Sequence, residues 1–195
     1  METENMVASA YRSISEAMVC GTDIDFEGLH SAAKELLLAL TVIEQRPVNM
    51  MELPVKHLLL LSDDSVLTLN IEEGICADAR ENIGAGIALI YAYYALPRLS
   101  SLGDFKEGNS ANACAELEEV LRLSLGPVPD MRDILDDDVF EMVWVLIEMA
   151  NGFAEDLVEI APELQGCKKL SDKELDEIKE EFLTYLKEKY QGKEA

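Results

Sequence analysis

Residues 25–47 read DFEGLHSAAKELLLALTVIEQRP, and their apolar side chains recur every three or four positions. That spacing predicts an amphipathic helix with one side against a core. Asp25 belongs to the residue types that cap helix N-termini, and Pro47 cannot continue a helix, so both ends of the helix are marked. The predicted apolar side consists of Phe26, Leu29, Ala33, Leu36, Leu37, Leu40 and Ile43.

Both ends of the chain also carry helical patterns. At the C-terminus, Ser171 and Glu174 form a capping box, which predicts a helix over about residues 171–191 that we expect to be peripheral. At the N-terminus we expect a helix that ends near Gly21, because glycine is common just beyond a last helical turn. The apolar side of this first helix consists of Val7, Tyr11, Ile14 and Met18.

A long apolar helix is predicted over about residues 72–96, with Pro97 just beyond its last turn. Gly84 and Gly86 give one side of this helix little bulk, so a neighbouring helix can approach it closely. Its most apolar run has about 15 residues, fewer than the ~20 needed to span a bilayer. We therefore expect a buried helix and no membrane span.

Two more helices are expected in the second half of the chain. Asn109 or Ser110 can cap a helix that Gly126 ends. An aspartate at position 130 or 136 can open a long helix that reaches about residue 160, since Pro162 prevents its continuation.

The segment between residues 49 and 71 has two competing predictions. Asn49 and Glu52 have the spacing of a capping box, but Pro54 follows closely, so a short or restarted helix is expected there. Residues 65–71 alternate between polar and apolar, which is typical of a strand, so a small β-hairpin near residues 57–71 is the alternative. We favour helices, because an isolated hairpin would have no sheet to join.

These patterns predict the all-α class and a single-domain bundle of six or seven helices over residues 1–195. A chain of 195 residues is about the size of one domain. Because 49% of the residues are hydrophobic, the chain can bury a core despite its net charge of -23.

The charge limits the classes of partner. With 39 acidic and 16 basic residues, the chain is not expected to bind nucleic acid or an anionic membrane directly, since both require basic side chains. A basic protein surface is the partner that this charge favours. The N-terminus lacks the basic and apolar regions of a secretory signal, and no two cysteines form a close pair, so we expect free thiols in the cytoplasm.

The acidic residues are concentrated between positions 130 and 181, a segment that contains 17 acidic and 5 basic side chains. The centre of this segment could meet a cationic surface and steer its association. Alternatively, these acidic residues have no partner and simply form the solvent-exposed first turn of a helix, where aspartates interact favourably with the positive end of the helix dipole. The predicted partner-binding residues are Asp133, Asp136, Asp137, Asp138 and Glu141.

A metal site is the main alternative. Carboxylates four or seven positions apart share a side of one helix, and Mg²⁺ prefers oxygen ligands, so Glu141, Glu148 and Glu155 are candidate metal ligands. A Mg²⁺- or Mn²⁺-dependent nucleotide phosphohydrolase would use such acids, with residues 116–119 as a second set. Asp137 and Glu159 extend the same stripe, whose simpler interpretation is the wet side of a buried helix.

Other motifs give little support for catalysis. Glu27 and His30 have the Glu-x-x-His spacing of di-iron bundles, but such bundles need the motif twice and no glutamate lies three residues before His57. Both histidines are therefore expected at a surface or interface. The chain has no phosphate-binding loop and no nucleophile elbow.

The sequence thus favours a non-enzymatic acidic binding factor without a cofactor. Such a factor would be an adaptor, a chaperone-like protein or an inhibitor, and in its extreme form a nucleic-acid mimic. The phosphohydrolase with Mg²⁺ and a structural homo-oligomer are the alternatives.

Overall fold

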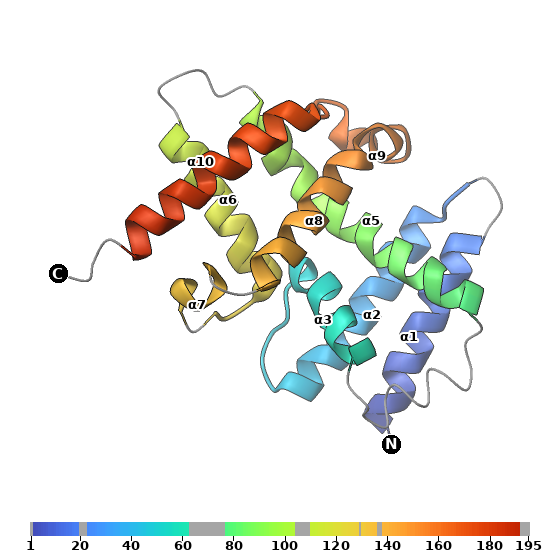
Figure 1. The fold of residues 1–195 in the computed structure, drawn as a ribbon. Coiled ribbons are helices and arrows are strands. Elements are labelled where there is room, and N and C mark those ends of the chain that lie inside the picture. The colour runs from blue at the N-terminus through green and yellow to red at the C-terminus, as the bar shows by residue number, and fades with distance from the viewer. Residues whose placement is uncertain are drawn as a thin grey trace. The chain divides into compact units, whose positions relative to one another are not determined.

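The computed structural model describes residues 2–19, 23–62, 77–103, 110–128, 130–135 and 138–191. Within these ranges the chain forms nine α-helices and two 3-10 turns without a strand, which confirms the all-α prediction (Figure 1). The helix count exceeds the expected six or seven. None of the helices in these ranges combines the length and the apolar character that crossing a membrane requires.

The chain divides into two compact units, Met1–Tyr91 and Ala92–Ala195. One helix, α5 (Ala77–Leu102), begins in the first unit and ends in the second. This division does not test whether residues 1–195 behave as one domain, so the single-domain expectation stays a prediction.

In the first unit, α1 (Glu2–Val19) packs against α2 (Phe26–Glu44) (Figure 1). Asp25 caps α2 as predicted, because its Oδ1 accepts a hydrogen bond of 2.9 Å from the Gly28 N–H. The expected apolar sides are buried for the most part, although Met18, Phe26 and Leu37 are half-buried and Ile43 is exposed. The buried members are Val7, Tyr11, Ile14, Leu29, Ala33, Leu36 and Leu40.

The glycines of α5 differ in their surroundings. A Cβ atom on Gly86 would lie 2.9 Å from Cγ2 of Ile14 and 3.1 Å from Cδ1 of Leu29, so α5 passes close to both α1 and α2. The predicted close packing is confirmed at Gly86. At Gly84 the described residues show no such approach, since an added Cβ would meet none of their atoms within 4 Å.

The predicted capping box at Asn49 is present and begins a 3-10 turn, η1 (Met50–Glu52), which leads into α3 (Leu53–Ser62). The Glu52 carboxylate accepts the Asn49 N–H, and the Asn49 side chain accepts the Met51 N–H. Residues 57–62 are helical, so the hairpin alternative is wrong for that part. Residues 63–71 lie outside the described residues.

The expected end of the long helix at Pro97 is wrong. Pro97 lies inside α5, which continues to Leu102 although proline lacks the N–H for the helical hydrogen bond. The turn beyond it buries Leu99 and Leu102, and this burial offsets the cost of about 3 kcal/mol for an interior proline. The expected start at residues 72–76 lies outside the described part.

In the second unit, α6 (Ser110–Leu125) ends at Gly126, whose φ of 73° favours glycine, as predicted. The single helix expected up to residue 160 is instead three helices: α7 (Met131–Leu135), α8 (Asp138–Gly152) and α9 (Ala154–Ile160). Gly152 at the second break has the low helix propensity that permits an interruption.

The C-terminal part of this unit consists of a 3-10 turn, η2 (Pro162–Leu164), and α10 (Asp172–Tyr190). The predicted capping box at Ser171 is present. α10 packs against α6 and α7 and buries Leu175, Phe182 and Leu186 (Figure 1).

Candidate partner-binding face

The exposed side of α8 mixes acidic and apolar residues. Val145 is 50% exposed and Met149 is 41% exposed, although large apolar side chains are usually buried. Four of the exposed residues follow one another at steps of three and four, and Met149 lies four positions after Val145, so they share one side of the helix. We call this set the α8 face: Asp138, Glu141, Val145, Glu148 and Met149.

The opposite side of α8 anchors the helix in the second unit. Phe140 stacks on Trp144 with ring centroids 6.2 Å apart, and it also contacts the ring of Phe182 in α10. Val143 and Ala150 are completely buried. The α8 face is therefore presented by a helix whose other side is fixed by packing.

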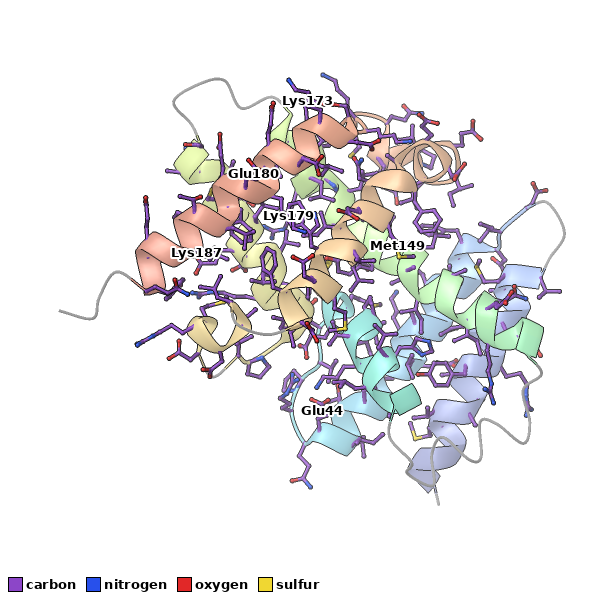
Figure 2. All side chains as sticks on the ribbon, viewed as in Figure 1. Glu44, Met149, Lys173, Lys179, Glu180 and Lys187 are labelled. Carbon is purple, nitrogen blue, oxygen red and sulfur yellow. The ribbon has the colours of Figure 1, made fainter. Side chains whose placement is uncertain are left out.

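One carboxylate of the α8 face is already neutralised. Lys179 lies on α10, where Figure 2 labels it. Its Nζ lies 2.8 Å from Oε2 of Glu141 and 5.6 Å from the centre of the Trp144 ring. Among the described residues, neither Asp138 nor Glu148 has an ion-pair partner. No described basic side chain therefore compensates these two charges.

A hollow of about 350 Å³ lies beside the C-terminal end of α8, where it meets the start of α10. Asn151 lines it, is itself buried, and hydrogen-bonds both the N–H and the C=O of Leu170. Three carboxylates and one ammonium group line what we call the α8–α10 hollow. Its lining is Glu148, Asn151, Gly152, Lys169, Asp172, Leu175 and Asp176.

The structure unites only some of the predicted partner-binding residues. Asp138 and Glu141 lie in the first turn of α8, whereas Asp133 belongs to the separate short helix α7. Asp136 and Asp137 lie outside the described residues.

The alternative metal ligands are not on one continuous helix. Glu141 and Glu148 lie on α8, but Glu155 lies on α9, beyond the interruption at Phe153. Glu159 also lies on α9, and Asp137 is outside the described part. Within the described ranges, no three side chains of His, Cys, Asp or Glu are grouped so that they could hold a metal ion.

The second acid set of the metal hypothesis has structural partners. Glu116 forms an ion pair of 2.8 Å with Arg98. Glu118 is buried between α6 and α10, where burial alone would raise its pKa. Hydrogen bonds from Lys189, Tyr190 and Tyr185 outweigh this effect and lower the pKa of Glu118 to about 2. Glu118 therefore holds two helices together.

Of the two positions expected for His57, a surface or an interface, the surface position is wrong. Its ring is buried, and its Nδ1 lies 3.0 Å from the hydroxyl oxygen of Tyr11 in α1. Burial lowers the pKa of His57 to about 4, so the ring is neutral at pH 7. His30 is half-buried on α2, with its ring edge-on to Phe26.

Val145 and Met149 are the functional candidates that sequence reasoning missed. They lie four and eight positions after Glu141, on the same side as the acidic stripe, so their exposure could have been inferred from that spacing. The apolar residues around them hid this signal, because the helix was expected to be buried everywhere except at its acidic stripe.

No protein-family model, no curated protein and no solved structure matches this chain. The functional interpretation therefore depends on the geometry and chemistry of its own side chains.

Proposed function

We propose that this protein is a non-enzymatic, acidic, helical binding factor that holds a basic surface of a partner protein against the α8 face. The observation that carries the proposal is the exposed pair Val145 and Met149 beside the carboxylates of Asp138 and Glu148, which form no ion pair with a described residue. An adaptor, a chaperone-like protein and an inhibitor all fit this arrangement.

The two kinds of side chain would contribute differently. Covering the exposed halves of Val145 and Met149 contributes on the order of 1 kcal/mol each, and such apolar contacts determine how slowly a complex dissociates. The carboxylates around them contribute mainly to the association rate and to the choice of a basic partner. Because Val145 and Met149 form an apolar centre on the α8 face, this face favours a protein interface with a water-free core. A nucleic-acid mimic, the extreme case, would need only the acidic side chains.

Quantitative affinity capture tests the proposal. The full-length protein, tagged at its N-terminus, is incubated with lysate of the source organism, and the captured proteins are measured by mass spectrometry. We expect the unaltered protein to capture a group of basic proteins. The double variant Val145→Ser, Met149→Ser should capture at least tenfold less of each of them.

The matched control is Leu38→Ser, Val42→Ser on α2. These residues are also apolar, four positions apart and exposed by 63% and 59%. If the α8 variant and the α2 control capture the same proteins in the same amounts as the unaltered chain, the α8 face is not the binding surface and the proposal fails.

A further inference from the structure

The spacing on the α8 face matches the repeat of a second helix. Val145 and Met149 are four residues apart, which corresponds to about 6 Å along the helix axis. A partner helix with apolar residues three or four positions apart has nearly the same repeat, so its side chains can fit between these two. An extended segment repeats its side chains at a similar distance of about 6.7 Å, but the backbone of α8 is already paired within its own helix and offers no sheet edge to such a segment. A helix, which pairs its own N–H and C=O groups, is therefore the element that fits this face.

The α8–α10 hollow continues this surface beyond the end of α8. Glu148 belongs to both, and Gly152, one turn after it, leaves the entrance without a side chain; a Cβ there would meet nothing within 4 Å. At about 350 Å³ the hollow is at the small end of ligand pockets, suited to one long side chain.

The charge of the hollow determines which side chain it accepts. Glu148, Asp172 and Asp176 surround it, against the single cation of Lys169. A lysine or an arginine of a partner would find carboxylate oxygens on more than one side, and arginine can bind them in pairs. A second copy of this chain is disfavoured, because each copy carries a net charge of -23.

Two other surfaces allow a comparison. The exposed apolar pair on α2, Leu38 and Val42, lies one turn after Glu35, which lines an acidic hollow of about 310 Å³ together with Glu16 and Asp25. In that hollow the Asp25 carboxylate already accepts the Gly28 N–H as the cap of α2. The groove of about 470 Å³ between α6 and α10 is lined by Glu180, Glu181 and Glu188, but none of the described residues that line it is an exposed large apolar side chain. The groove between α6 and α10 serves as a control without an exposed apolar pair, and the α2 surface serves as a control with an apolar pair and an acidic hollow of its own.

We infer that the partner element bound by the α8 face is a basic amphipathic helix, which lays its apolar side on Val145 and Met149 and inserts one lysine or arginine into the α8–α10 hollow. This inference rests on the proposed function and specifies the chemistry of its partner.

Two synthetic peptides of 18 residues test the inference. The first has leucines at every third or fourth position with lysine and arginine elsewhere, so that it forms a basic amphipathic helix. The second has the same composition in an order that places its leucines all around the helix. Binding to the full-length protein is measured by isothermal titration calorimetry, and the site is mapped by NMR on ¹⁵N-labelled protein.

We expect the amphipathic peptide to bind at least tenfold more tightly than the shuffled one. The strongest amide shifts should fall on residues 145–152 and 169–176. The double variant Val145→Ser, Met149→Ser should weaken binding at least tenfold, and Asp172→Asn, Asp176→Asn should weaken it and reduce its dependence on salt. The controls Leu38→Ser, Val42→Ser and Glu180→Gln, Glu188→Gln should change the affinity less than twofold.

The outcomes separate the inference from the proposed function. If the shuffled peptide binds as tightly and the α8 variants weaken both peptides equally, the helical partner is overturned while a basic partner on this face stands. If the α8 variants affect neither peptide more than the two controls do, both proposals are overturned. If the α8 variants instead abolish self-association seen by analytical ultracentrifugation, the occupant is a second copy and the inference is overturned.

Discussion

Single polar side chains join distant parts of each unit. In the second unit, Asn151 binds both backbone groups of Leu170, at 2.8 Å and 2.9 Å, and so replaces the pairing that a neighbouring backbone would provide. In the first unit, the Tyr11 hydroxyl joins α1 to His57 on α3. Both contacts are buried, where a lost partner costs more than it does at the surface.

His57 should make the protein sensitive to mild acid. Its folded pKa of about 4 lies below the ordinary value of 6.5, so the unfolded chain takes up the proton first. The stability of the folded chain is therefore complete above pH 6.5 and falls as the pH drops toward 4, by up to about 3 kcal/mol.

The variant His57→Gln isolates this effect, because glutamine can still hydrogen-bond Tyr11 but does not titrate in this range. Urea unfolding at pH 7, 6 and 5 should show a smaller loss of stability for the variant than for the unaltered chain. Equal losses in the two proteins would rule out His57 as the cause.

For single residues, the sequence predicted those contacts that form between residues close together in the chain. The caps at Asp25, Asn49 and Ser171 involve residues within three positions, so their patterns were sufficient. The burial of His57 and the exposure of Val145 depend on which helix lies opposite, and one sequence does not contain that information.

Among the helices, α5 shows how packing overrides local preference. It contains glycines and an interior proline, all unfavourable in a helix, and it nevertheless extends over 26 residues. The aromatic and aliphatic side chains that it buries compensate for these residues. The end expected at Pro97 was wrong because a single sequence does not show how much the following turn can bury.

The two α5 glycines provide a matched pair of substitutions. Gly86→Ala should lower the free energy of unfolding by about 1–2 kcal/mol, since overpacking against Ile14 and Leu29 outweighs the gain in helix propensity. At Gly84 the added methyl group would touch no described residue, so Gly84→Ala should raise the free energy of unfolding by about 0.5–1 kcal/mol. Urea unfolding of both variants measures the difference; shifts of the same sign and size would refute the close approach at Gly86.

The interruption of the helix expected up to residue 160 bears directly on function. A single helix would have aligned Glu141, Glu148 and Glu155 on one stripe, as the metal hypothesis required. The separate helix α9 removes Glu155 from that line and leaves Glu148 at the edge of the α8–α10 hollow. The sequence placed the acids on helices but could not reveal the breaks between them.

For the molecule as a whole, the net charge of -23 is the dominant property. Like charges repel and destabilise a compact chain, and dissolved salt screens that repulsion over about 8 Å at physiological ionic strength. Added salt should therefore stabilise the protein without binding at any particular site.

Divalent cations separate screening from binding. We expect 5 mM Mg²⁺ or Mn²⁺ to raise the Tm no further than NaCl at the same ionic strength, because the described residues contain no group of three ligands. Differential scanning fluorimetry makes the comparison. An additional rise of several degrees with either divalent ion would indicate selective binding to the folded chain and would favour the metal-dependent phosphohydrolase.

Helix termini normally fray, yet the last turn of α10 is tied to the middle of α6. Lys189 and Tyr190 both hydrogen-bond Glu118, which is buried, while the final residues of most helices have only solvent beside them. The amides near residue 190 should consequently exchange with solvent more slowly than their place at a helix end implies. A chain shortened before Lys189 would keep most of α10 but leave a buried carboxylate without two of its donors.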